Sequence, residues 1–202
     1  WHHVPEVPAG LPLIADMSSD MMSWPIDASK FDVIYAGAQK NIGPSGTTMV
    51  LLRKSMLERI PKNLPTMLDY NTHVSKDSMF NTPPCWNIYI VGLVLKWIEK
   101  NGGLKGVQKL NQEKAAYVYD MIDKYNQFYK GTAAKEDRSL MNITFRLPSE
   151  ELEKQFIQEA AANDMIGLKG HRSVGGCRAS VYNSCPMESA RALGQFMEEF
   201  AK

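Results

Sequence analysis

The chain has 202 residues, of which 44% are hydrophobic and 22% are charged, a composition that is ordinary for a globular protein. Its 23 Lys and Arg residues nearly balance its 22 Asp and Glu residues, so the formal net charge of +1 gives no reason to expect nucleic acid or an anionic membrane as a partner. The longest apolar stretch, residues 88–97, is far shorter than the roughly 20 residues that cross a bilayer. Any recognition of an anion must therefore come from a local group of charges.

Three cysteines, Cys85, Cys177 and Cys185, form an odd number without C-x-x-C spacing. This pattern argues against a disulfide framework and against a structural zinc site, so we expect a reducing, cytoplasmic compartment and no bound metal. The chain begins with Trp1, His2 and His3, without an initiating methionine or a signal-peptide pattern. We therefore expect it to be a fragment of a longer protein.

Two short apolar runs near the start of the chain, residues 13–15 and 33–36, predict buried strands of a parallel sheet. The segment between them is long enough for the crossover that parallel strands need, which takes about a dozen residues or more. Asp16 and Lys40 would then follow equivalent ends of neighbouring strands. That edge of an α/β sheet is where ligands bind.

Residues 47–52 predict a third strand, at which the sheet would end, and residues 54–60 predict a short helix that Pro61 closes. The long stretch of residues 61–84 is predicted to be irregular. A loop of that length is uncommon in a compact domain unless it is functional.

Apolar residues recur at helical spacing in residues 85–100, and a second, longer helix is predicted at about 104–125. This second helix is long enough to carry the chain from one domain into another. Beyond it the pattern alternates between short strands and helices, which is typical of an α+β unit. The strands are predicted at residues 139–147 and 178–182 and the helices at 149–163 and 187–200. We therefore expect the end of a large parallel-sheet domain in residues 1–103 and a small α+β domain in residues 104–202.

Residues 35–46 place small side chains around one lysine, Lys40, directly after an apolar strand. Small residues let a bulky ligand approach the backbone. A lysine that forms a Schiff base must be partly desolvated or paired with a charge, so that its amine becomes nucleophilic. The same residues would also suit a solvated loop, so this segment alone leaves both interpretations open.

Asp16 lies upstream of Lys40, at the end of its own predicted strand. A pyridoxal ring needs a carboxylate beside its pyridine nitrogen to stay protonated as an electron sink, and Asp16 would suit that role. A single Asp in such a position is more often a helix cap or a turn former.

Several segments together carry a more specific signal: ADMSS at 15–19, PID at 25–27, YAGAQKN at 35–41, Tyr70, FNTPP at 80–84 and LKGHRSVGGCRASVYN at 168–183. In sequence, order and spacing, these segments closely resemble the phosphoserine aminotransferase family of class V pyridoxal-phosphate enzymes. The resemblance covers nearly the whole chain from about Leu11. It implies a fold type I α/β architecture and the carboxyl-terminal part of an enzyme, since family members are much longer at the amino terminus.

The resemblance implies a cofactor site around Lys40, which would form the Schiff base with pyridoxal 5'-phosphate and act as acid and base. Asp16 would be the partner of the pyridine nitrogen, with Ser18 and Gln39 near the cofactor. Asn81 and Thr82 would reach across a homodimer interface to the cofactor phosphate of the partner subunit. Their alternative role is a helix cap before the next helix.

A cationic group surrounds the glycine pair 175–176, and the resemblance assigns it to the substrate. Arg178 would bind the α-carboxylate, while His171 and Arg172 would lie near the phosphate or side-chain carboxylate. Planar guanidinium groups suit such anions, although two arginines near a strand are also common as surface charges.

The implied reaction is transamination between glutamate and 3-phosphooxypyruvate, giving phosphoserine and 2-oxoglutarate in serine biosynthesis. One alternative is another class V enzyme, such as a serine or alanine glyoxylate aminotransferase or a cysteine desulfurase. His171 with Arg172 favours a phosphorylated or dicarboxylic substrate, and no cysteine lies in an obvious mobile loop. The other alternative is an inactive fragment that acts only as a dimerisation module, because the missing portion would supply the cup for the cofactor phosphate.

Overall fold

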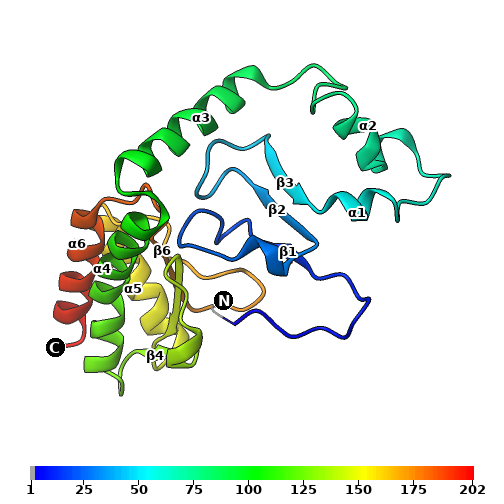
Figure 1. The fold of residues 1–202 in the computed structure, drawn as a ribbon. Helices are drawn as coiled ribbons and strands as arrows, with labels where there is room; N and C mark the ends of the chain where they lie inside the picture. The colour runs from blue at the N-terminus through cyan, green and yellow to red at the C-terminus, as the bar shows by residue number, and fades with distance from the viewer. Residues whose placement is uncertain (1–2) are drawn as a thin grey trace. The chain divides into compact units, whose positions relative to one another are not determined.

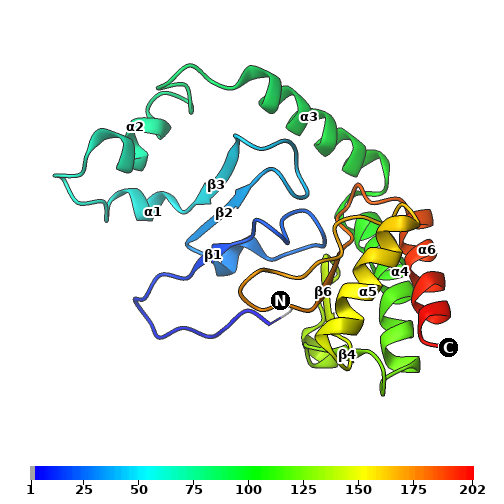
Figure 2. The same ribbon diagram turned by 180° about the vertical axis from the view of Figure 1, so that it is seen from behind.

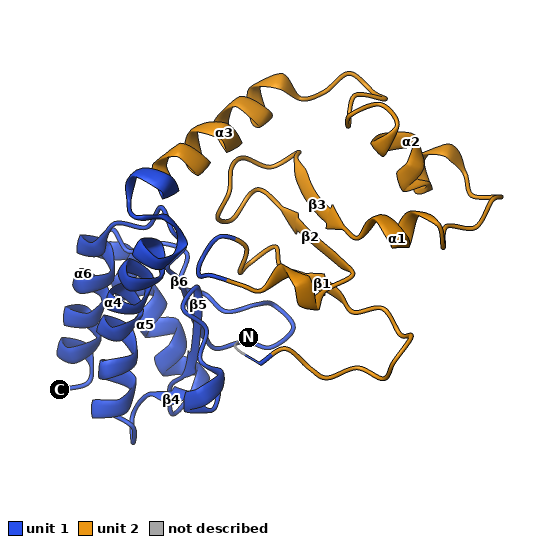
Figure 3. Ribbon diagram, in the orientation of Figure 1, with its two compact units in different colours: residues 1–3, 22–25, 98–202 blue, residues 4–21, 26–97 orange. Residues whose placement is uncertain are grey.

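The computed structural model describes residues 3–202, so the expectations that rest on Trp1 and His2 lie outside the described residues. The chain forms two compact units (Figure 3). Of the described residues, unit 1 contains His3, 22–25 and 98–202, and unit 2 contains 4–21 and 26–97. The predicted domain boundary after residue 103 stays a prediction.

The centre of unit 2 is a three-stranded sheet in the order β1-β2-β3 (Figure 1). β1 (Ile14–Asp16) runs parallel to β2 (Val33–Gly37), and the register places Asp16 opposite Tyr35. β3 (Thr48–Leu52) pairs with β2 in the antiparallel direction. The three predicted strands are confirmed, but the expectation that the first is buried is wrong, because β1 is an edge strand of this sheet and Ile14 is 55% exposed. The parallel pairing of β1 and β2 brings the ends of both strands to one edge of the sheet.

Short helical segments connect and follow these strands. They are η1 (Ala28–Lys30), α1 (Lys54–Leu57), η2 (Thr66–Leu68) and α2 (Tyr70–Val74). The longer helix α3 (Cys85–Lys100) follows, and its residues from 98 onward are counted with unit 1. The expectation that residues 61–84 are irregular is wrong in part, because η2 and α2 lie within them. Asp69 begins α2, and its carboxylate accepts a hydrogen bond from the Asn71 amide at 2.8 Å. An acidic residue directly before a helix is a helix-capping signal, because its carboxylate can accept a hydrogen bond from a free amide of the first turn.

Unit 1 contains a second sheet, in the order β4-β5-β6, with antiparallel pairing throughout. Its elements are α4 (Gly103–Lys124), β4 (Lys130–Gly131), η3 (Lys135–Asp137), β5 (Asn142–Arg146), α5 (Glu150–Ala162), β6 (Cys177–Ser180) and α6 (Met187–Phe200). The helices α4, α5 and α6 lie on one side of this sheet in both views (Figures 1 and 2). The predicted α+β pattern is confirmed, whereas the two-residue strand β4 is too short to leave a periodic signal.

Aromatic rings fill the core between the sheet and the helices of unit 1. Phe156 on α5 is fully buried, with its ring centroid 5.7 Å from that of Phe145 on β5 and 5.1 Å from those of Phe196 and Phe200 on α6. The ring planes of Phe156 and Phe145 stand perpendicular, the edge-to-face geometry that aromatic quadrupoles favour. One side chain therefore links β5, α5 and α6.

Two buried polar side chains on α4 hold the backbone that follows β6. Lys114 donates to the carbonyl oxygens of Val181 and Tyr182 at 3.2 and 2.6 Å, and burial lowers the pKa of its amine. Asn111 donates to the Asn183 side chain at 2.8 Å and to the Ser23 carbonyl at 3.0 Å. Because these side chains are buried, each hydrogen bond replaces one that water would otherwise supply. They secure the short segment 22–25 within unit 1.

Among the described residues, no helix combines the length and the apolar character that a membrane-crossing segment needs.

Replacing the Phe156 ring tests the proposed centre of the unit 1 core. The change Phe156→Ala leaves a cavity against the rings of Phe145, Phe196 and Phe200 and should lower the free energy of unfolding by about 3–5 kcal/mol. Urea unfolding followed by far-UV circular dichroism measures the loss. The control Ile166→Ala removes a side chain that is 84% exposed and should change stability by less than about 0.5 kcal/mol. Equal midpoints for the two variants would contradict this assignment.

Candidate active site

The Ser18 hydroxyl group joins the ends of β1 and β2. It donates to Asp16 Oδ1 at 2.6 Å and accepts a hydrogen bond from the Gly37 amide at 3.0 Å. The Ser18 amide donates to the same carboxylate oxygen at 2.9 Å. Asp16 is thus fixed at the same edge of the sheet from which the segment carrying Lys40 begins.

These hydrogen bonds stabilise the charged form of Asp16. The Ser18 hydroxyl is the main cause that lowers the pKa of the Asp16 carboxyl below its ordinary value, followed by the Ser18 amide. The Tyr35 side chain, which is opposite Asp16 in the strand register, and the positive charge of Lys40 act in the same direction. Asp16 is therefore an anion at neutral pH. The sequence did not single out Tyr35 for this contact, because the register between strands determines it.

Lys40 lies in the tight turn after β2, and hydrogen bonds hold the residues before and after it. The Ile42 and Gly43 amides both donate to the Ala38 carbonyl, at 3.2 and 2.8 Å, and the buried Asn41 side chain donates to the Met21 carbonyl at 3.2 Å. Lys40 itself is half-buried and, within the described residues, makes no hydrogen bond or ion pair. Its amine is therefore available to a ligand.

Gln39 packs beside this turn because residue 37 has no side chain. A Cβ atom placed at Gly37 would lie 2.5 Å from Gln39 Oε1, so a larger residue at position 37 would displace the end of this side chain. The Gln39 side chain is exposed. Asp16, Ser18, Gln39 and Lys40, which the resemblance assigned to one site, thus all lie at the edge formed by the ends of β1 and β2.

Asn81 and Thr82 lie in a different part of unit 2, shortly before α3, and both are exposed. The Asn81 amide group has the Met67 sulfur as its neighbour, at 4.0 Å. Pro84 stands directly before α3, whose first residue is Cys85. Their assignment to a partner subunit stays a prediction.

In unit 1, His171 and Arg172 belong to a hairpin loop, residues 170–176, that directly precedes β6. The Gly170 amide donates to the Gly176 carbonyl at 2.8 Å and closes the loop at its base. His171 Nδ1 lies 2.7 Å from the Ser173 hydroxyl. The imidazole is thereby oriented, while both His171 and Arg172 remain exposed.

Arg178 projects from β6, in register with Thr144 of β5. Its Nε atom is buried and has no hydrogen-bond partner within the described part of the chain. A buried charged donor without a partner is unfavourable, and a carboxylate would satisfy it through the planar guanidinium group. This unsatisfied donor fits the expected role of Arg178 toward an anionic ligand.

A pocket of about 460 Å³ opens between the 170–176 loop and α5. Four cationic side chains and one imidazole line it, against two carboxylates: Arg146, Lys154, Lys169 and Arg172, then His171, with Glu150 and Glu153. The sequence pattern did not single out Arg146 or Glu153, which are far from the loop along the chain. The cations outnumber the carboxylates, so this pocket has the local positive charge that recognition of an anion would need.

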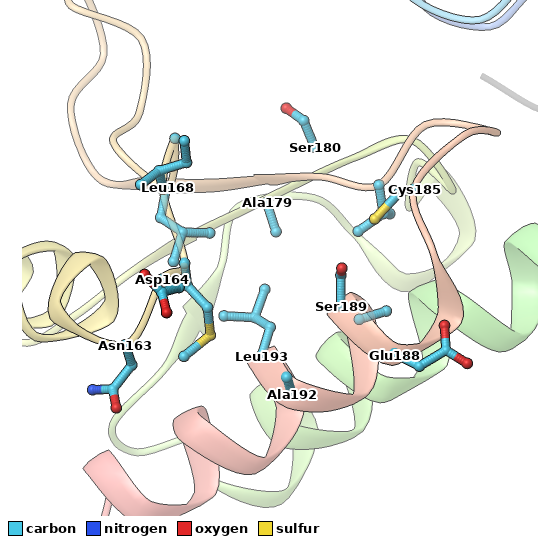
Figure 4. A pocket seen from close by; sticks show the side chains of 15 residues that line it. Asn163, Asp164, Leu168, Ala179, Ser180, Cys185, Glu188, Ser189, Ala192 and Leu193 are labelled. Carbon is cyan, nitrogen blue, oxygen red and sulfur yellow. The ribbon is translucent and has the colours of Figure 1, made fainter.

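A larger pocket of unit 1, of about 590 Å³, contains none of the predicted site residues (Figure 4). Its charged side chains are the carboxylates of Asp164 and Glu188, so it has no group to attract an anion. Cys185 also lines it, and burial raises the pKa of that thiol. A thiol of this kind is a poor nucleophile at neutral pH. We therefore assign two candidate sites, each within its own unit: the smaller pocket of unit 1 and the edge of the unit 2 sheet.

Within unit 2, an anionic carboxylate and a lysine without an ion pair stand at the ends of adjacent parallel strands, and these are the two groups that an aminotransferase needs beside its cofactor. The model of the family "Aminotransferase class-V" matches residues 3–193, and the chain belongs to this family.

The curated relatives are more specific. The chain is 58% identical over 200 residues to the phosphoserine aminotransferase of Lysinibacillus sphaericus, which covers 99% of this chain and 55% of that protein. It is 55% identical over 202 residues to the phosphoserine aminotransferase of Geobacillus kaustophilus, which covers 100% of this chain and 56% of that protein. The chain thus spans about half the length of the curated relatives it matches.

Solved structures agree with this result. The phosphoserine aminotransferase of Bacillus circulans subsp. alkalophilus matches with a TM-score of 0.95 and 54% identity, over 100% of this chain and 55% of that one. A pyridoxal-phosphate-bound phosphoserine aminotransferase from Trichomonas vaginalis matches with a TM-score of 0.91 and 42% identity, over 98% and 56% of the two chains. The predicted family and the fold type I architecture are confirmed.

The hydrogen bond from Ser18 to Asp16 has a measurable consequence. Because the pKa of Asp16 is lower in the folded protein than its ordinary value of 3.8, Asp16 stabilises the fold above that pH. This contribution is lost as the pH falls through the lowered value. The change Ser18→Ala removes the hydroxyl donor and should raise the pKa of Asp16 toward 3.8. A carboxyl-detected NMR titration measures it, with Ser19→Ala as the control that should leave it unchanged. An unchanged pKa in Ser18→Ala would contradict the assigned cause.

Proposed function

We propose that this chain supplies the cofactor lysine and the substrate-binding arginines of a phosphoserine aminotransferase. The reaction is the transfer of an amino group from glutamate to 3-phosphooxypyruvate, which gives phosphoserine and 2-oxoglutarate. We assign the whole reaction to a protein that also contains the portion of the relatives that this chain does not cover. The observation that carries the proposal is the juxtaposition of anionic Asp16 with unbonded Lys40 at one edge of the unit 2 sheet.

Pyridoxal phosphate, when bound, supplies a protonated pyridine ring that accepts electrons from a bond broken at the substrate Cα. Asp16 supports this chemistry because it carries a negative charge at neutral pH and lies at the exposed edge of the sheet. Ser18 keeps that carboxylate both charged and oriented. Asp16 therefore suits the role of a partner that holds a proton on the ring nitrogen.

Lys40 has two tasks in this proposal. It holds the cofactor covalently through its Nζ atom, and once free it accepts the proton from the substrate Cα. Both tasks need an amine that is not already engaged in a salt bridge. The tight turn between Ala38 and Gly43 limits the freedom of the backbone that carries it.

In this proposal, side chains of unit 1 bind the anionic groups of the substrate. Arg178 binds the α-carboxylate, for which its buried, unsatisfied Nε is the supporting observation. His171 and Arg172 bind the phosphate of phosphoserine or the side-chain carboxylate of glutamate, supported by the cationic lining of their pocket. The two anionic ends of the substrate would thus have separate recognition groups.

We also propose that the protein acts as a homodimer in the cytoplasm. Exposed Asn81 and Thr82 stand beside a helix, α3, whose side chains Trp86 and Tyr89 are 70% and 58% exposed, and such apolar exposure favours an interface. In the dimer, Asn81 and Thr82 would contact the cofactor phosphate of the partner subunit. All three cysteines are free, which fits a reducing compartment.

Cofactor attachment is the first experiment. The chain mixed with pyridoxal phosphate should show the visible absorption of a lysine-bound cofactor, and Lys40→Ala should abolish it because no other amine occupies the position. The control Lys30→Ala removes an exposed lysine of η1 and should keep the parental spectrum. Parental absorption in Lys40→Ala would refute the assignment. If the parent chain shows no absorption, the same three proteins are tested after fusion to the uncovered portion of the Lysinibacillus sphaericus relative.

Arg178→Lys tests substrate recognition in the same fusion protein. A lysine keeps the charge but loses the planar pair of donors, so the KM for glutamate should rise about tenfold to a hundredfold. Steady-state kinetics with 3-phosphooxypyruvate measure the change, and the cofactor absorption should stay at the parental level. Arg191→Lys, on the exposed face of α6, is the matched control. An unchanged KM in Arg178→Lys would remove Arg178 from the substrate site.

A further inference from the structure

The 170–176 loop is held together mainly by its own backbone. Besides the bond between Gly170 and Gly176, the Val174 and Gly175 amides both donate to the His171 carbonyl, at 3.0 and 2.8 Å. His171, Arg172, Ser173 and Val174 are all exposed, so the tip of the loop buries little apolar surface. A segment with few buried contacts opens easily, unless something outside it holds it in place.

Arg146 provides an external anchor. This residue is the last of β5, and its Nη1 atom donates to the Val174 carbonyl at 3.0 Å. Its Nε atom donates to Glu153 Oε1 of α5 at 2.6 Å. One guanidinium group therefore joins the tip of the loop to the first turns of a helix.

Glu153 holds the arginine in position. Its side chain is only 8% exposed, whereas that of Arg146 is 39% exposed, so the carboxylate is the buried member of the ion pair. Glu153 Oε1 also accepts a bond from the Leu147 amide at 3.4 Å. A buried carboxylate without its cation is strongly unfavourable, and this keeps Arg146 paired and oriented.

The packing of the loop base gives independent support. Gly176 has a φ of +72°, and a Cβ atom placed there would lie 2.6 Å from Arg146 Cδ and 3.0 Å from the Phe145 carbonyl oxygen. Only glycine allows the backbone of residue 176 to lie directly against the arginine stem in this conformation. The loop thus rests on Arg146 at its base and is hydrogen-bonded by Arg146 near its tip.

We propose that Arg146 is a positioning residue that, with Glu153 behind it, holds the loop so that His171 and Arg172 meet the anionic group of the substrate. The inference rests on the proposed function for the role of His171 and Arg172. Arg146 itself need not touch the substrate. An arginine is needed because two donors of one rigid plane serve the carboxylate and the carbonyl together, which a single ammonium group cannot do.

Two variants of the chain test whether the loop is held by the hydrogen bond from Arg146 to Val174 or only by the positive charge of Arg146. The double variant Arg146→Met with Glu153→Gln keeps the net charge and leaves no unpaired buried carboxylate, but it removes the bond to Val174. Arg146→Lys keeps a cation for Glu153 and loses the second planar donor. Arg191→Met, a change on the exposed face of α6, is the control for the loss of an arginine elsewhere.

Amide hydrogen exchange, measured by NMR, reports on the loop directly. In the double variant the Val174 and Gly175 amides should exchange about tenfold faster or more, since one charge-assisted hydrogen bond is lost. The Val181 amide, bonded to Met141 at 2.8 Å, should exchange as in the parent. Arg146→Lys should also speed loop exchange, and Arg191→Met should not. Parental loop exchange in the double variant, or equal acceleration at Val181, would overturn the proposal.

Titration with inorganic phosphate tests the link to the substrate. In the parent chain phosphate should shift the amide signals of His171 and Arg172, and its affinity should fall about tenfold in the double variant, matching the loss of one charge-assisted hydrogen bond. The double variant has the parental net charge, so such a fall does not come from a change in the net charge of the chain. Unchanged affinity despite faster exchange would overturn the role of Arg146 toward the anion.

The two readouts also distinguish this inference from the proposed function. If phosphate does not shift the amide signals of His171 and Arg172 in the parent chain, the assignment of these residues to the substrate fails. The part of the proposal that links Arg146 to binding of the anion then fails as well. Faster loop exchange in the double variant would still support Arg146 as the anchor of the loop.

Discussion

The hydrogen bonds of the Ser18 hydroxyl are the contact on which the candidate site of unit 2 depends. One oxygen atom donates to Asp16 and accepts from Gly37, so it connects the ends of two parallel strands and stabilises a charge between them. The parallel pairing of β1 and β2 makes this possible, because it brings both ends to the same edge of the sheet. Lys40 follows within the same turn, and its charge further favours the anionic form of Asp16.

In unit 1 as well, hydrogen bonds hold exposed side chains in place. Its loop of residues 170–176 must present cationic side chains to solvent while burying little surface of its own. The ion pair of Arg146 and Glu153 and the carbonyl contacts of Lys114 use buried polar groups to secure the backbone on either side of β6. In both units the exposed chemical groups are thus held by hydrogen bonds to the backbone, and the apolar core provides the frame for these bonds.

Much of the fold follows from local patterns. The helices α3 and α6 begin and end at the residues predicted from the sequence pattern, and the structure shows that Ser149 caps α5 by accepting a hydrogen bond from the Leu152 amide. The two-residue strand β4 and the short helices within residues 61–84 were missed, since segments of a few residues have no period to detect. The family resemblance located Lys40, Asp16 and Arg178, which periodicity alone left equivocal.

From its order of residues alone, the chain reveals its longer strands and helices, its α/β class and its family, because these depend on sequence patterns and motifs of neighbouring residues. The contacts that orient its chemical groups join residues far apart in the chain, such as Gly37 with Ser18, Arg146 with Val174, and Asn111 with Asn183. The parallel register that places Tyr35 beside Asp16 is of the same kind. No spacing rule encodes such pairs, since they form only when separate strands, helices and loops pack together.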